Sequence, residues 1–166
     1  MSPRSPEKPV RLHRIRVFEG DRRALLDLFH AADDSVSQIM SYIALGDVLV
    51  ATAGDGIVGH IQIVDDDEAH ACEIKSLAVA QDSQRRGVGS ALIAAALRRA
   101  DEGGCRRIVV ATAAADIGNL RFYQRRGFRM TRVVRDAFGP EKGYAEGIAV
   151  DGIVLRDQVI LERVLR

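Results

Sequence analysis

A strand pattern runs into a loop with two closely spaced glycines, and a helical pattern follows at once. The strand covers residues 71–79, the loop contains Gly87 and Gly89, and the helix is expected over residues 88–102. Glycines one residue apart at a helix start let the backbone turn tightly, so unpaired amides and the positive end of the helix dipole face one spot. The segment therefore predicts a fold of strands and helices with an anion-binding cradle suited to a diphosphate.

Three interpretations of this loop compete. A dinucleotide-binding fingerprint needs a third glycine where Leu92 stands, and the phosphate loop of nucleotide hydrolases needs Gly-Lys followed by Ser or Thr, which is absent. The third interpretation is a plain strand-to-helix turn whose glycines serve geometry alone. Arg85 and Arg86 precede the glycines and add positive charge beside the cradle.

In the rest of the sequence, segments with the two-residue hydrophobic period of strands alternate with segments that have the 3.6-residue period of helices. Two amphipathic helices are expected after Asp21 and Ser35, and an Asp-Gly pair marks a hairpin turn. Further strands are expected at residues 11–18, 48–52, 57–64, 107–112, from 128 onward and at 153–165, with a short helix at 119–126. We therefore expect an α/β (α+β) fold with a mixed, mostly antiparallel sheet of about six to seven strands flanked by about four helices. In the second half of the chain, strand, helix and strand follow in that order, which implies a right-handed parallel crossover.

The composition fits one soluble domain. The chain has 166 residues, 47% of them hydrophobic and 28% charged, and we assign residues 1–9 to a flexible leader and 10–166 to a single domain. A formal net charge of +1 argues against nucleic acid or an anionic membrane as a partner. The sequence shows neither an apolar run long enough for a membrane helix nor a signal peptide, so we expect the protein in the cytoplasm.

Cysteines and histidines give no sign of a metal site. Cys72 and Cys105 lack CxxC spacing, and we interpret both as small, buried, reduced residues rather than as a disulfide or redox pair. The four histidines lack HxxH and HExxH spacing and are expected at the surface or in packing roles: His13, His30, His60 and His70.

The order of elements and motifs resembles the GNAT superfamily of N-acetyltransferases. The acetyl-CoA loop of that family, Q/R-x-x-G-x-G/A, is intact here as Gln84, Gly87 and Gly89. Asn119 and the Phe-Tyr pair before Phe128 follow where the family has them, and the resemblance covers residues 10–165. A single GNAT-like domain with acetyl-CoA as cosubstrate and no metal is what the resemblance implies.

The resemblance also implies which residues contact acetyl-CoA. Amides of residues 85–90 would hold the pyrophosphate, and the backbone of residues 77–79 would pair with the pantetheine arm like a strand. In the family this strand carries a bulge, and the two central parallel strands splay to admit the thioester. The residues assigned to cofactor binding are Leu77, Ala78, Val79, Gln84, Arg85, Arg86, Gly87, Val88, Gly89, Ser90, Asn119, Phe122 and Tyr123.

Acetyl transfer to an amine requires a base and favours an acid. Freeing a lysine-like amine of its proton at neutral pH costs about 4.6 kcal/mol. By resemblance Glu73 is the base and Tyr123 the acid that protonates the departing thiolate. For Glu73 the alternative is a structural ion pair with Lys75, and for Tyr123 it is a packing position in the core. Asp66 is a rival candidate for the base.

The function that follows is transfer of acetyl from acetyl-CoA to a primary amine of a small molecule or peptide by direct attack. Cys72 matches no nucleophile position of the family, which disfavours a covalent intermediate. Alternatives are a non-catalytic acyl-CoA sensor or interaction module and a purely structural domain. Tyr144 and Glu146 either border the acceptor site or only occupy a loop, and residues 152–165 form either an ordinary strand or the contact of a homodimer.

Overall fold

The computed structural model describes residues 13–66 and 68–166, which form strands, helices and short 3-10 turns. The helices are α1 (Leu26–Ala32), α2 (Val36–Tyr42), α3 (Val88–Glu102) and α4 (Ile117–Gln124). The strands are β1 (Arg14–Val17), β2 (Asp47–Ala53), β3 (Gly56–Asp66), β4 (Ala71–Val79), β5 (Arg107–Ala113), β6 (Arg129–Val134), β7 (Ala149–Val150), β8 (Ile153–Val154) and β9 (Gln158–Val164). The 3-10 turns are Arg22–Leu25, Gln81–Ser83 and Pro140–Lys142.

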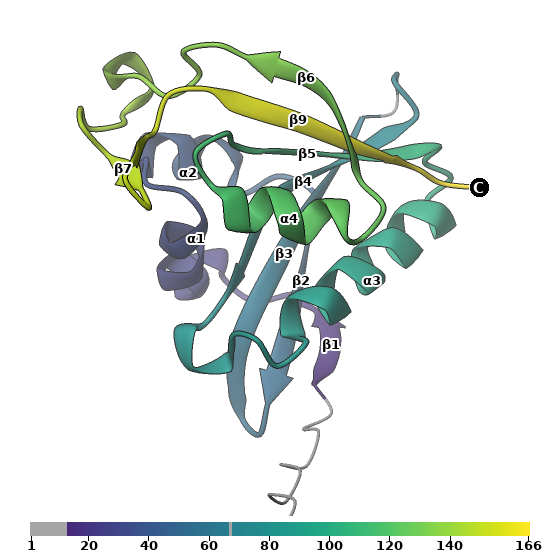
Figure 1. Ribbon diagram of the computed structural model, residues 1–166. Coiled ribbons are helices and arrows are strands. Elements are labelled where there is room, and N and C mark those ends of the chain that lie inside the picture. The colour runs from purple at the N-terminus through teal and green to yellow at the C-terminus, as the bar shows by residue number, and fades with distance from the viewer. Residues whose placement is uncertain (1–12, 67) are drawn as a thin grey trace, which may run out of the picture.

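Seven strands form one sheet in the order β1-β2-β3-β4-β5-β9-β6, and β7 and β8 form a separate hairpin. Only β4 and β5 run parallel, while the other neighbours in the sheet are antiparallel. The expected mixed, mostly antiparallel sheet with four helices is thereby confirmed. Figure 1 shows β5, β9 and β6 fanning away from the direction of β2 to β4.

The sheet separates two hydrophobic layers because side chains alternate along each strand. In β2, Leu49 and Ala51 face the layer that α3 covers. The residues between them, Val48 and Val50, face the layer that α1 and α2 cover with Phe29 and other apolar side chains. Figure 1 shows α3 and α4 together in front of the sheet, with α1 and α2 beside its left edge. A ligand or chain segment that contacts both layers must therefore pass through a gap between strands or around an edge of the sheet.

Side-chain caps set two of the helix starts. The Ser35 Oγ accepts from the Gln38 amide at 3.3 Å and begins α2. The Asp116 Oδ1 accepts from the Asn119 amide at 2.8 Å, so α4 begins two residues before the expected start at Asn119. No helix among the described residues is long and apolar enough to cross a membrane.

The two ends of the chain differ in how far the structure describes them. The leader at residues 1–9 lies outside the described residues. The expected last strand at 153–165 divides into β8 and β9, and β9 lies between β5 and β6 with partners on both sides. Its backbone therefore has no free edge, so of the two alternatives for this segment the ordinary sheet strand is the one that β9 fits.

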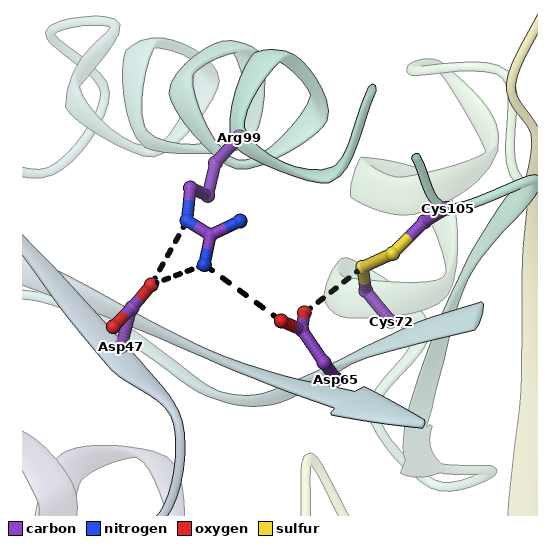
Figure 2. The surroundings of a disulfide bond; sticks show 5 residues. All are labelled: Asp47, Asp65, Cys72, Arg99 and Cys105. Atoms are coloured by element: carbon purple, nitrogen blue, oxygen red, sulfur yellow. Dashed lines mark hydrogen bonds and ion pairs between the residues drawn. A yellow bond between two sulfur atoms is a disulfide. The ribbon is translucent and has the colours of Figure 1, made fainter. Parts of the chain in front are cut away.

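The expectation of two separate reduced cysteines is also wrong. Cys72 and Cys105 form a disulfide with Cα atoms 6.2 Å apart (Figure 2). The parallel register explains the pairing, because Cys72 lies opposite Ile108 and the Arg106 amide donates to the His70 carbonyl at 2.8 Å. The crossover through α3 thus returns the chain beside β4, which the spacing of the cysteines along the sequence does not reveal.

The surroundings of the disulfide are charged on one side. The Asp65 Oδ1 lies 3.3 Å from the Cys72 sulfur, which carries no proton to donate while it is bonded to Cys105 (Figure 2). The second carboxylate oxygen of Asp65 faces the Arg99 guanidinium at 3.7 Å, and Asp47 contacts the same guanidinium at 2.6 Å. The hydrogen bond from Arg99 to Asp47 raises the pKa of Arg99. These contacts join α3 to β2 and β3.

Candidate functional site

The centre of the site is the point where β4 and β5 part. Their parallel pairing begins at Ala71 and Arg107 and stops after Ile74 and Val110, although both strands continue. On the other side of β4 the register to β3 shifts, and Lys75 is the additional residue of a β-bulge. The bulge and the splay implied by the resemblance are therefore present. Beyond Ile74 the β5-facing edge of β4 is free to pair with an extended ligand.

The loop after β4 presents unpaired amides. Gly87 caps α3 with φ +82° and a Cβ built on it would meet no atom within 4 Å. Within the described residues no backbone hydrogen bond is donated by the amides of residues 85–90. Six donors at a helix start without backbone partners in the described chain fit the pyrophosphate of acetyl-CoA.

Three side chains of this loop take different parts. The Gln84 Nε2 donates to the Val79 carbonyl at 3.1 Å, so Gln84 ties the loop to the end of β4. Arg85 and Arg86 are exposed, and in the described part of the chain neither has an ion-pair partner. Both guanidinium groups therefore remain available to a phosphate.

Gly89 differs from Gly87 because its neighbourhood is full. A Cβ at Gly89 would lie 3.2 Å from two ring carbons of Phe122 on α4. The guanidinium of Arg126 lies 3.6 Å from the centre of the same ring, donates to the Phe122 carbonyl at 2.7 Å and contacts the Ser90 hydroxyl. Burial and the neighbouring Arg125 lower the pKa of Arg126. Gly89 thus lets α4 pack closely on the start of α3.

Arg126 was not predicted from the sequence as a site residue. It follows Phe122 by four positions, the spacing at which two side chains meet on one helix face. This spacing in the sequence could therefore have predicted the contact between Arg126 and Phe122. Its contact with Ser90, on another helix, has no signal in the local sequence.

The two predicted residues on α4 lie in different surroundings. Asn119 is exposed, and its Nδ2 lies 3.5 Å from the Thr112 hydroxyl on β5. Tyr123 is 4% exposed and packs edge-on against Phe122 and Phe128. Burial, with a smaller contribution from Asp116, raises the pKa of Tyr123, which keeps its hydroxyl protonated. Tyr123 is therefore a core aromatic residue that retains a proton.

Glu73 forms the ion pair that was one of its two interpretations. The Lys75 Nζ lies 3.2 Å from the Glu73 Oε1, with the side chains 35% and 41% exposed respectively. The same ammonium lies 5.8 Å from the ring centre of Tyr42 on α2. The pair therefore lies on the face of the sheet that α1 and α2 cover. The rival base Asp66 accepts from the Ala69 amide at 3.1 Å in the hairpin turn.

A second set of contacts on this face was not predicted. The Tyr42 hydroxyl donates to Asp33 at 3.2 Å, and the Tyr144 hydroxyl donates to its other carboxylate oxygen at 2.8 Å. Burial is the main cause that raises the pKa of both tyrosines, and Asp33 adds to it. Tyr144 thus ties the loop before β7 to α1, whereas Glu146 is exposed. The polar residue at the end of a helix was the only local signal for Asp33.

The family follows from comparison with known proteins. The model of the acetyltransferase (GNAT) family matches residues 16–128. The chain belongs to this family. Acetyl-CoA, which GNAT enzymes use without a metal, is therefore the cosubstrate of this protein, and the cradle of residues 85–90 fits it.

Similar GNAT proteins share most of the chain. The "uncharacterized N-acetyltransferase YvbK" of Bacillus subtilis is 32% identical over 148 residues, which are 89% of this chain and 94% of that protein. The crystal structure of a Bacillus subtilis acetyltransferase in complex with CoA has a TM-score of 0.84 at 31% identity, covering 93% of this chain and 100% of that one. A GNAT acetyltransferase from Elizabethkingia anophelis with acetyl-CoA bound has the same TM-score at 28% identity, covering 92% and 98%.

Proposed function

We propose that the protein acetylates a primary amine of a small molecule or peptide by direct attack on acetyl-CoA. The observation that carries the proposal is the position of Glu73. Its carboxylate holds a primary ammonium, that of Lys75, at 3.2 Å beside the point where β4 parts from β5. An acceptor amine must lose a proton before it attacks, and a carboxylate in this place can accept that proton.

The proton moves through two residues in this proposal. Glu73 accepts the proton of the acceptor ammonium, either directly or through water. Tyr123 protonates the departing thiolate; its place on α4, one turn after Asn119, supports this role, whereas burial raises its pKa and makes it a weaker acid. A tyrosine with a raised pKa is unsuited to act as the base.

Residues of α3, α4 and β4 would hold the cosubstrate. The amides of residues 85–90, with Arg85 and Arg86, would contact the phosphates, and the open edge of Leu77–Val79 would pair with the pantetheine arm. Asn119 would contact it from α4. Bound acetyl-CoA supplies an activated acetyl thioester, and the chain supplies position and proton transfer.

Direct attack is supported by the state of Cys72. Its sulfur is bonded to Cys105, so no thiol is present there to accept an acetyl group. The acceptor would approach from the face with Asp33, Tyr42 and Tyr144, because Glu73 opens to that face. A cytoplasmic location and a homodimer stay predictions.

The first experiment is calorimetric titration of the protein with acetyl-CoA. Gly87→Glu should abolish binding, because the new carboxylate enters the cradle and repels phosphate. Gly104→Glu is the matched control: its φ is +77°, a Cβ there meets nothing within 4 Å, and it lies past the opposite end of α3. Equal binding by both folded variants would contradict the placement of the cosubstrate.

The second experiment measures thiol release with a panel of amines. Glu73→Gln should lower the rate about 100-fold and leave the affinity for acetyl-CoA unchanged. Binding of acetyl-CoA without thiol release for any amine would favour the sensor alternative. An unchanged rate in Glu73→Gln would remove Glu73 as the base.

A further inference from the structure

Lysines are scarce in this chain. Only three of its 24 basic residues are lysines, namely Lys8, Lys75 and Lys142, and the others are arginines. An arginine guanidinium keeps its proton in proteins and is no acceptor for an acetyl group at neutral pH. The chain therefore offers very few amines of its own to an acetyl donor, and one of them lies at the candidate active site.

Lys75 and Lys142 have different surroundings. Lys75 is the bulged residue of β4, and its ammonium lies 3.2 Å from Glu73 and 5.8 Å from the centre of the Tyr42 ring. The Lys142 ammonium donates to the Ala137 carbonyl at 3.0 Å, on the loop before β7. Lys75 is thus a cationic amine near both the proposed base and an aromatic ring, whereas Lys142 is not.

We propose that Lys75 is itself an acetyl acceptor, so that the enzyme acetylates its own β4 strand; this inference rests on the proposed function. Glu73 takes a proton from the Lys75 ammonium, and the freed amine attacks the thioester carbonyl of acetyl-CoA. The new N–C bond forms, the C–S bond breaks, and CoA leaves as a thiolate that takes up a proton. The amide nitrogen loses its second proton to solvent.

Self-acetylation changes the site that performs it. An acetylated Lys75 is neutral, so its ion pair with Glu73 and its cation–π contact with Tyr42 are lost. Glu73 is then free of its internal counter-ion and open to a cationic acceptor. The reaction within one molecule also has a kinetic signature, because its first-order rate constant does not depend on protein concentration.

Peptide mass spectrometry of the full chain incubated with acetyl-CoA tests the proposal. We expect one acetyl group on Lys75, formed at a rate independent of protein concentration and suppressed by excess free CoA. Lys75→Arg should remove this product while keeping a cation beside Glu73, and Lys142→Arg is the matched control that should leave it unchanged. Glu73→Gln, checked for folding by its thermal melt, should slow acetylation of Lys75 about 100-fold.

Each other outcome counts against the proposal. Equal acetylation of Lys8, Lys75 and Lys142, or no suppression by free CoA, would indicate uncatalysed chemistry. Thiol release with an added amine while Lys75 stays unmodified would overturn self-acetylation and keep the proposed function. If the protein does not bind acetyl-CoA, both self-acetylation and the proposed function are overturned. The same holds if neither thiol release nor acetylation is observed. An undiminished rate in Glu73→Gln would overturn the part assigned to Glu73.

Discussion

The buried histidine of β3 makes the stability of this protein depend on pH. His60 is fully buried, packs against the Phe29 ring at 4.4 Å between centres, and its Nε2 lies 2.8 Å from the Ser76 hydroxyl. Its Nδ1 is buried and has no hydrogen-bond partner among the described residues. Burial lowers the pKa of His60 from the ordinary 6.5 to about 4, so the folded chain holds the ring neutral.

The sign and the size of the effect follow from proton linkage. Between pH 4 and 6.5 the unfolded chain binds a proton at His60 that the folded chain does not bind, so stability falls as the pH falls. At about pH 5 the free energy of unfolding should be about 2 kcal/mol lower than at about pH 7 through this residue alone. Below about pH 4 the loss levels off at about 3 kcal/mol, because the folded chain then also binds the proton.

Urea unfolding of the protein and of His60→Gln at both pH values measures the contribution of His60 to the pH dependence of the free energy of unfolding. Glutamine is polar and does not titrate, so the exposed histidines and the carboxylates contribute equally to the two proteins. We expect the unmodified chain to lose about 2 kcal/mol more than His60→Gln between about pH 7 and about pH 5. The same loss in both proteins would refute the reasoning, because it would show that burial does not hold His60 neutral.

Three further predictions concern the contacts around the site. Gly89→Ala should lower the free energy of unfolding by about 1–3 kcal/mol and weaken acetyl-CoA binding, because its Cβ crowds the Phe122 ring; urea unfolding and calorimetry test this, and Phe122→Leu should restore stability. Reduction of the disulfide, which closes a separation of 33 residues, should lower the free energy of unfolding by about 3–4 kcal/mol. Cys72→Ala should not respond to reductant in the same urea assay, and an equal response would contradict the assignment. Tyr144→Phe removes the hydrogen bond to Asp33 at 2.8 Å, so it should lower the free energy of unfolding by about 1 kcal/mol and raise the KM for the acceptor. An unchanged KM would show that this loop does not contribute to the acceptor site.

The sequence predicts those parts of the fold that have strong local signals. β4 and α3 begin and end at the predicted residues, because β-rich composition, the capping position of Gly87 and the glycines after Glu102 all act locally. The GNAT resemblance adds the bulge and the splay, which no local pattern indicates. Element ends with weaker signals moved, such as the start of α4, which Asp116 sets.

Contacts between distant segments were the part that could not be predicted. Tyr144 and Asp33 are 111 residues apart, and their hydrogen bond depends on how the late loop meets α1. The disulfide depends in the same way on the parallel register of β4 and β5. Neither register nor loop docking leaves a periodic pattern in a single sequence, so composition and spacing around Cys72 led to the wrong state of its sulfur.

The two glycines of the motif show why the site needs both faces of the sheet. Gly87 supplies the positive φ at which α3 begins, whereas Gly89 lets Phe122 approach, and α3 and α4 lie in the same layer. Glu73 and Lys75 open to the layer of α1 and α2. In the proposed function, a cosubstrate bound in the cradle would approach Glu73 through the place where β4 and β5 part, just beyond Ile74 and Val110. The bulge at Lys75 lies at that opening, so the residue that breaks the register of β4 is also the one whose amine faces the proposed base.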